Sequence, residues 1–159
     1  MVVLDQAVIP VTAAIEEVGT GFEYWVGPAS RGPLDPSVVG LTGPVTSLVL
    51  KPFAPVGVTA RRGADGITLA WIRRTRRGGD AWEAVEVPLE EEAELYEVDL
   101  FQGGTRVRTL ASAASTLLYP AAVEAADFGG PQSALTVSVA QVSAVVGRGF
   151  PRTVTVPVL

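Results

Sequence analysis

The sequence contains no cysteine and no histidine among its 159 residues. The lack of cysteine excludes disulfides, thiolate metal sites and cysteine nucleophiles, and the lack of histidine removes the commonest metal ligand and acid/base group. Ser112, Ser115 and Thr116 therefore have no histidine to activate them as nucleophiles. We assign no catalytic, cofactor-binding or metal-binding residue and expect that the chain is not an enzyme.

Charged residues are also scarce, at 18% of the chain, which is below the usual quarter. The net charge of -5 lacks the clustered basic excess that nucleic-acid binding requires, so we expect no nucleic-acid partner. Hydrophobic residues reach 48% with a mean hydropathy of +0.35. We expect partner subunits to bury this excess of apolar surface.

No long apolar run is present near the start of the chain. Val2, Val3 and Leu4 are followed by Asp5, with no basic region before them and no extended apolar stretch after them. The sequence therefore predicts neither a signal peptide nor a membrane span.

Turn chemistry divides the chain near residue 52. Short apolar runs at residues 2 to 4, 8 to 11, 22 to 26 and 45 to 50 predict a few short strands, with a Gly- and Pro-rich separator at residues 27 to 44. Residues 51 to 55 contain two prolines and predict a stiff connector. We expect a β-rich N-terminal attachment segment, residues 1 to 52, and a sandwich, residues 53 to 159.

Alternation of apolar and polar residues predicts half-buried antiparallel strands in the second region. It runs through residues 67 to 71, 96 to 100, 135 to 139 and 153 to 158. This pattern places Glu97 and Asp99 on the solvent side of their strand.

Turn signals complete the expected sandwich. Gly103-Gly104 predicts a hairpin turn, after which residues 105 to 110 pair back. Residues 120 to 127 predict one or two helical turns in a loop, ended by Gly129-Gly130. The spacing of the strands indicates a sandwich of about seven.

Residues 55 to 159 contain five successive landmark segments: Val56-Gly57-Val58-Thr59-Ala60, Ile67-Thr68-Leu69-Ala70-Trp71, Tyr96-Glu97-Val98-Asp99-Leu100, Leu135-Thr136-Val137-Ser138-Val139 and Gly147-Arg148-Gly149-Phe150-Pro151. Together they resemble the landmarks of a fibronectin type III domain. The resemblance implies an all-β, immunoglobulin-like sandwich with Trp71 and Tyr96 in its core, on facing sheets. Leu135 stands where the family has its corner tyrosine, so we expect that hydrogen bond to be missing and the preceding connection to be irregular.

A second resemblance spans nearly the whole chain. Its motifs are Tyr24-Trp25-Val26-Gly27-Pro28-Ala29, Leu34-Asp35-Pro36-Ser37, Lys51-Pro52-Phe53-Ala54-Pro55-Val56, Trp71-Ile72-Arg73-Arg74-Thr75-Arg76, Gly79-Asp80-Ala81-Trp82, Val85-Glu86-Val87-Pro88-Leu89 and residues 122 to 127. They are similar to the C-terminal portion of the gene transfer agent baseplate protein, or megatron, which is shared with siphophage-like tails. The upstream glycoside-hydrolase-like and hub domains of that family have no counterpart here, so their activity is not carried over.

The second resemblance implies membership of a phage-like tail tip or baseplate. We therefore expect hub, distal tail and tail fibre proteins as partners, with trimeric or hexameric copies in a ring. The implied location is the virion, after synthesis in the bacterial cytoplasm without a signal peptide.

Two groups of residues form the candidate interaction surface. Arg73, Arg74, Arg76 and Arg77 suit a phosphate or anionic sugar, but nine acids between Asp80 and Asp99 follow them, so we favour ion pairs within the chain or with a neighbour. We expect at least one bidentate arginine–carboxylate pair. The run of acids within residues 90 to 94 matches neither a calcium loop nor a glycosidase pair.

The aromatic group is Tyr24, Trp25 and Trp82, which suits an aromatic platform for sugar stacking. A structural baseplate component is the leading interpretation of the chain. The alternative is a receptor- or carbohydrate-binding module on the same particle, using the Trp82 loop to contact a host-surface glycan. If the early segment is the attachment, a chain lacking residues 1 to 50 folds but does not enter particles.

Overall fold

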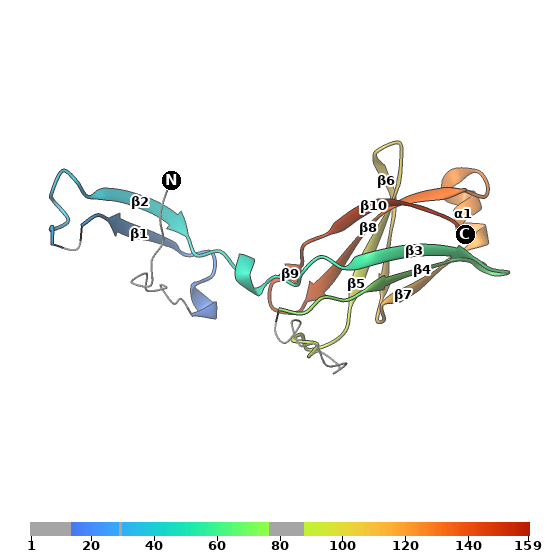
Figure 1. The fold of residues 1–159 in the computed structure, drawn as a ribbon, viewed down its shortest axis with the longest axis horizontal. Helices are drawn as coiled ribbons and strands as arrows, with labels where there is room; N and C mark the ends of the chain where they lie inside the picture. Colours follow the sequence, from blue (N-terminus) through green and yellow to red (C-terminus); the bar gives the residue numbers. More distant parts are fainter. Residues whose placement is uncertain (1–13, 29, 77–87) are drawn as a thin grey trace. The chain divides into compact units, whose positions relative to one another are not determined.

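The computed structural model describes residues 14 to 28, 30 to 76 and 88 to 159. The chain divides into two compact units, Met1–Val49 and Leu50–Leu159 (Figure 1). The first 3-10 helix and the first two strands are η1 (Ile15–Glu17), β1 (Gly21–Val26) and β2 (Val39–Pro44). After η2 (Leu48–Leu50) follow β3 (Val56–Arg62), β4 (Gly66–Ile72), β5 (Tyr96–Gln102), β6 (Thr105–Ser112), β7 (Thr116–Pro120), α1 (Ala121–Phe128), β8 (Ala134–Ser143), β9 (Gly147–Arg148) and β10 (Arg152–Pro157).

The second unit is a sandwich of two antiparallel sheets. One sheet has the order β3-β4-β7, and the other has the order β10-β8-β5-β6, with the two-residue β9 paired to β8. The strand β6 pairs with β5 through the hairpin, so the seven longer strands divide three and four. The prediction of an all-β, fibronectin type III-like sandwich is confirmed.

The core lies where the inward faces of the two sheets meet. Trp71 on β4 is 5% exposed and Tyr96 on β5 is fully buried, as predicted for facing sheets. Their ring centroids lie 5.1 Å apart at 71°, an edge-to-face contact that adds to the burial of two large rings. Burial raises the pKa of the Tyr96 phenol, and the hydrogen bond it donates to Glu94 acts in the same direction.

The predicted solvent exposure of Asp99 is wrong. Asp99 lies on the outer face of β5, but only 4% of it is exposed. Arg148 contacts its Oδ2 at 2.6 Å, and the Thr109 hydroxyl donates to its Oδ1 at 2.6 Å. The alternation gives the correct face, but side chains from neighbouring strands cover the carboxylate.

Both predicted turn features are present. Gly103 and Gly104 have φ of 56° and 85°, which a hairpin turn of this kind requires and which glycine adopts without strain. The predicted helical segment is α1, which follows Pro120 and ends at Gly129 in the left-handed conformation.

Helix α1 is tied to both sheets by ion pairs. Arg62 of β3 donates to both oxygens of Glu124 at 2.9 Å, and Glu124 also accepts from the backbone N–H of Gln132 at 2.7 Å. Arg108 of β6 donates to both oxygens of Asp127 at 2.5 and 2.7 Å. The connection into β8 thus consists of the helix α1 followed by residues 129 to 133, which form neither helix nor strand.

The first unit contains an antiparallel ribbon of β1 and β2, paired from Gly21↔Pro44 to Val26↔Val39. The apolar run at residues 22 to 26 is a strand as predicted. The strand β2 lies in the expected separator, because its Gly40, Gly43 and Pro44 give it a turn-like composition. The run at residues 45 to 50 contains the 3-10 helix η2 where a strand was expected. The runs at residues 2 to 4 and 8 to 11 lie outside the described residues.

The proline-rich connector packs as part of the sandwich unit. Pro52 and Pro55 are buried, and the Pro52 carbonyl accepts a hydrogen bond from the N–H of Phe150 at 3.0 Å. A β-carbon at Gly149 would lie 2.7 Å from the Pro52 oxygen and 2.9 Å from the Gln141 oxygen. Only glycine permits this close approach of three backbone segments.

Replacing Trp71 by alanine is expected to lower the free energy of unfolding by about 3 to 5 kcal/mol, because it removes a large buried ring and leaves a cavity against Tyr96. Urea unfolding followed by circular dichroism measures the change. Ile72→Ala on the same strand is the control, since Ile72 is 63% exposed and its truncation should cost little. Equal effects of the two substitutions would contradict the described core.

Replacing Glu124 by glutamine is expected to cost about 1 to 3 kcal/mol near pH 7, because a buried acceptor of Arg62 and Gln132 is lost. The Arg62 hydrogen bonds hold the pKa of Glu124 below its ordinary value of 4.5, despite the opposing effect of burial. A carboxyl whose pKa is lowered on folding stabilises above its unfolded pKa, and this contribution disappears as the pH falls through the folded pKa.

The difference in unfolding free energy between wild type and Glu124→Gln should therefore shrink as the pH falls below about 4.5. Urea titrations between pH 7 and pH 3 measure it. Glu92→Gln, at an exposed glutamate, is the control and should show no comparable pH-dependent gap. A gap for Glu124→Gln that is constant across this range would refute the ionised pair.

Candidate functional site

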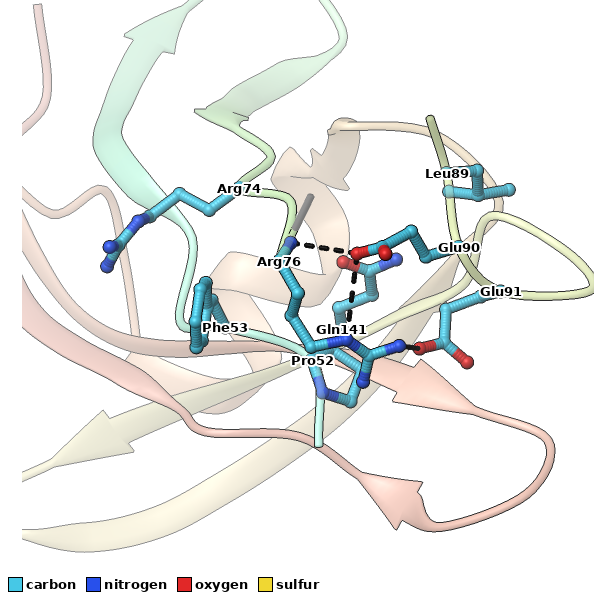
Figure 2. Close-up of a pocket in the computed structure, with 8 residues that line it drawn as sticks. All are labelled: Pro52, Phe53, Arg74, Arg76, Leu89, Glu90, Glu91 and Gln141. Carbon is cyan, nitrogen blue, oxygen red and sulfur yellow. Dashed lines mark hydrogen bonds and ion pairs between the residues drawn. The ribbon is translucent and has the colours of Figure 1, made fainter. Parts of the chain in front are cut away.

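The predicted arginine cluster lies directly after β4, in the connection that leads to β5. Figure 2 shows Arg74 and Arg76 together with Glu90 and Glu91, which lie on the returning part of this connection. Arg77 and Trp82 fall outside the described residues. Arg73 and Arg76 contact the returning part of the connection, whereas Arg74 lies over Phe53.

Hydrogen bonds join the outgoing segment to the returning segment. The Arg73 guanidinium donates to the Pro88 carbonyl at 2.8 Å, the Thr75 hydroxyl donates to Glu90 at 3.1 Å, and the N–H of Arg76 donates to Glu90 at 2.8 Å. Glu90 has φ of 59°, an uncommon value for a residue with a side chain. Its carboxylate contacts explain why this backbone conformation persists.

The Arg76 guanidinium completes this loop-base clasp, defined here as Arg73, Thr75 and Arg76 with residues 88 to 91. Its Nη2 lies 3.2 Å from Oε1 of Glu91, and its Nε lies 3.6 Å from Oε2 of Glu90 (Figure 2). The side chains of Arg76 and Glu91 are 20% and 6% exposed. Arg76 thus spans two carboxylates, where the sequence predicted a bidentate pair with one.

Arg74 points away from the glutamates and lies over the ring of Phe53, 5.1 Å from its centroid (Figure 2). The hollow between these groups has a volume of only about 10 Å³ and is also lined by Gln141. A space of this size holds about one water molecule. The clasp is therefore a structural closure with no room for an organic ligand.

The two described aromatic candidates do not form a joint platform. Tyr24 and Trp25 are consecutive in β1, so their side chains point to opposite faces of the ribbon. Trp25 is 57% exposed and borders an open hollow of about 250 Å³. Tyr24 is half-buried on the other face.

That other face of the ribbon is wholly apolar or glycine. Register places Phe22, Tyr24 and Val26 of β1 opposite Gly43, Leu41 and Val39 of β2. Val26, Val39 and Leu41 are 56%, 57% and 53% exposed. We call this set the apolar ribbon face. It exposes large side chains side by side, in contrast to the scattered exposed residues that are normal on surfaces.

Other charged groups of the sandwich also pair within the chain. Arg148 contacts Glu97 and Asp99 at 2.6 Å each. Among the described residues, no cluster of three or more acidic side chains is arranged to hold a metal ion. Within the same ranges, no helix has the length and apolar character to cross a membrane.

Sequence reasoning missed three parts of these sites. Gln141 follows the alternating Val137 and Val139 on β8, and nothing local indicates that it borders the clasp. Val39 and Leu41 are separated by Gly40, which hides the strand. Pro52 contacts Gly149 and Phe150, nearly 100 positions along the chain, and no local pattern reveals this.

Comparison with known proteins gives no family. No family model matches the chain, and no curated protein matches it. Among solved structures, the rat CD45 extracellular region, domains d3-d4, is 13% identical over 98% of this chain and 72% of that chain, with a TM-score of 0.44. The Clostridium perfringens spore cortex lytic enzyme SleM is 13% identical over 77% of this chain and 35% of its own, with a TM-score of 0.42.

The clasp predicts an energetic coupling between Arg76 and Glu91. A double-mutant cycle with Arg76→Met and Glu91→Gln should give a coupling of about 0.5 to 3 kcal/mol in unfolding free energy, because the two groups are in contact and mostly shielded from water. Urea unfolding of the four proteins measures it. The matched cycle with Arg74→Met and Glu91→Gln should give none, since Arg74 points away. Equal couplings in the two cycles would refute the clasp.

Proposed function

We propose that the chain is a non-enzymatic structural component of a phage-like tail tip or baseplate. In this proposal the β1–β2 ribbon attaches to a neighbouring subunit, and the sandwich is the domain that the attachment carries. The exposed apolar ribbon face is the single observation that supports it best.

An isolated two-stranded ribbon is marginal in water, because it has no second layer to bury its apolar side chains. Val26, Val39 and Leu41 each remain more than half exposed. Covering such side chains removes apolar surface from water and stabilises both the ribbon and the complex. A partner subunit supplies that cover.

The ribbon also has an unpaired edge for hydrogen bonding. Its sheet contains only β1 and β2 among the described residues. Backbone N–H and C=O groups on the outer sides of such strands pair readily with a strand from another chain. A partner strand that pairs with this edge has a fixed orientation. Contact of the partner with the apolar ribbon face then buries apolar surface.

The sandwich supports a structural role through its internal pairing of charge. Arg62, Arg76, Arg108 and Arg148 each contact a carboxylate of the same unit. Histidine and cysteine are absent from the chain, so few groups suited to catalysis remain. Hub, distal tail and tail fibre proteins are the proposed neighbours, with three-fold or six-fold copies in a ring on the particle.

Leu41→Lys is expected to reduce incorporation into assembled particles by about tenfold or more, because it places a charge in a surface that must be desolvated. Quantitative immunoblotting of purified particles measures incorporation. Thr42→Lys is the matched control: it adds the same charge at the next residue, on the opposite face of the ribbon, and should incorporate normally. Normal incorporation of Leu41→Lys would refute attachment through the apolar ribbon face.

Removal of residues 1 to 49 separates attachment from folding. The remaining sandwich should unfold cooperatively in urea, because its core lies within residues 50 to 159, and it should be absent from particles. A truncated chain that enters particles, or one that does not fold, would contradict this division of roles.

A further inference from the structure

The hollow beside Trp25 lies at the loop that joins β1 to β2. It is lined by Trp25, Gly27, Pro28, Arg31, Pro33 and Val38. Its volume of about 250 Å³ suits one small ring, unlike the water-sized space at the clasp. Trp25 points away from the apolar ribbon face, so this hollow is distinct from the proposed attachment surface.

The Trp25 indole has one supported face and one open face. A β-carbon on Gly40 would lie 3.4 to 3.7 Å from three atoms of its six-membered ring, so the ring covers Gly40 directly. The side chain remains 57% exposed. A fixed, half-open indole is a platform against which a flat apolar surface of a ligand packs.

The described residues of the loop around the hollow are joined by their own hydrogen bonds. The N–H groups of Arg31, Asp35 and Val38 donate to the carbonyls of Pro28, Gly32 and Asp35 at 2.9, 3.0 and 2.9 Å. Asp35 also accepts from the N–H and hydroxyl of Ser37 at 2.9 and 2.6 Å. The hollow is therefore preformed, and a ligand that binds there loses little free energy to ordering of the loop.

Arg31 provides polar recognition at the rim. Its Nη1 lies 3.5 Å from Oδ2 of Asp35, and its side chain is 61% exposed, so most of its N–H groups are available to a ligand. Arginine donates only, and a carboxylate accepts only. A hydroxyl group does both, and the Arg31–Asp35 pair therefore complements neighbouring hydroxyls better than it complements a carboxylate.

We propose that this hollow binds a neutral saccharide, with one pyranose ring stacked on Trp25 and its hydroxyls bonded to Arg31. The described charges of this unit favour a neutral ligand over an anionic one, since Glu16, Glu17, Glu23 and Asp35 outnumber Arg31. A proline-rich peptide fits less well, because such peptides use grooves lined by several aromatic rings and Trp25 is the one aromatic residue among those that line the hollow. The site does not depend on the proposed place in a tail.

The test uses the full chain and four probes: the methyl glycosides of glucose, galactose, mannose and N-acetylglucosamine. Saturation-transfer NMR should show transfer to the ring C–H protons of at least one of them. Trp25→Ala and Arg31→Met should each weaken binding by about tenfold or more, and Trp25→Phe should weaken it less. Leu34→Ala is the control, since Leu34 is 96% exposed in the same loop but does not line the hollow, and it should bind as wild type does.

Three results would overturn the proposal. The first is no transfer to any of the four glycosides at saturating concentration. The second is transfer that persists in both Trp25→Ala and Arg31→Met, which would place the sugar elsewhere. The third is binding of methyl glucuronide or a ten-residue proline peptide in place of the neutral glycosides. Arg31→Met changes only an exposed loop side chain, so its result does not depend on the stability of the ribbon.

Discussion

The architecture of the sandwich depends on two ion pairs made by helix α1. Glu124 binds Arg62 of β3, and Asp127 binds Arg108 of β6, so one short helix is fastened to a strand of each sheet. Buried carboxylates are costly unless they are paired and hydrogen-bonded, and removal of one partner leaves the other uncompensated. The pairs therefore fix the position of α1, and with it the connection between β7 and β8.

Arginine and carboxylate groups also close the opposite end of the sandwich. Figure 1 places α1 at one end and β9 at the other, and the clasp of Arg76 with Glu90 and Glu91 lies near Pro52 and Gln141 at the β9 end. Each closure joins segments that are distant in sequence, and each uses charges that would otherwise face solvent. The three described arginines of this segment therefore have partners within the chain: Arg73 and Arg76 contact the returning segment, and Arg74 lies over Phe53.

Sequence reasoning located the inward faces of the sandwich because burial imposes a period of two on each strand. That period places Trp71 and Tyr96 on the apolar faces of their strands, and the resemblance to a fibronectin type III domain implied that both lie in the core. It did not locate the ion pairs, since Arg62 and Glu124 are 62 positions apart and no local pattern connects them. The burial of Asp99 was missed for a similar reason, because Arg148 and Thr109 come from other strands. The strand β2 was missed because its glycines carry no apolar signal, although Gly40 lies directly beneath the Trp25 ring.

The two faces of the ribbon suit two different proposed roles at once. Alternation along β1 sends Tyr24 to the apolar ribbon face and Trp25 to the opposite face, beside the loop hollow. An attached partner on the apolar face would leave Trp25 and Arg31 open to solvent, so saccharide binding and attachment would not compete for the same side chains. A two-stranded ribbon has no core that forces one face inward, and this is why both faces remain available. The sandwich, whose strands must bury one face each, has no comparable freedom.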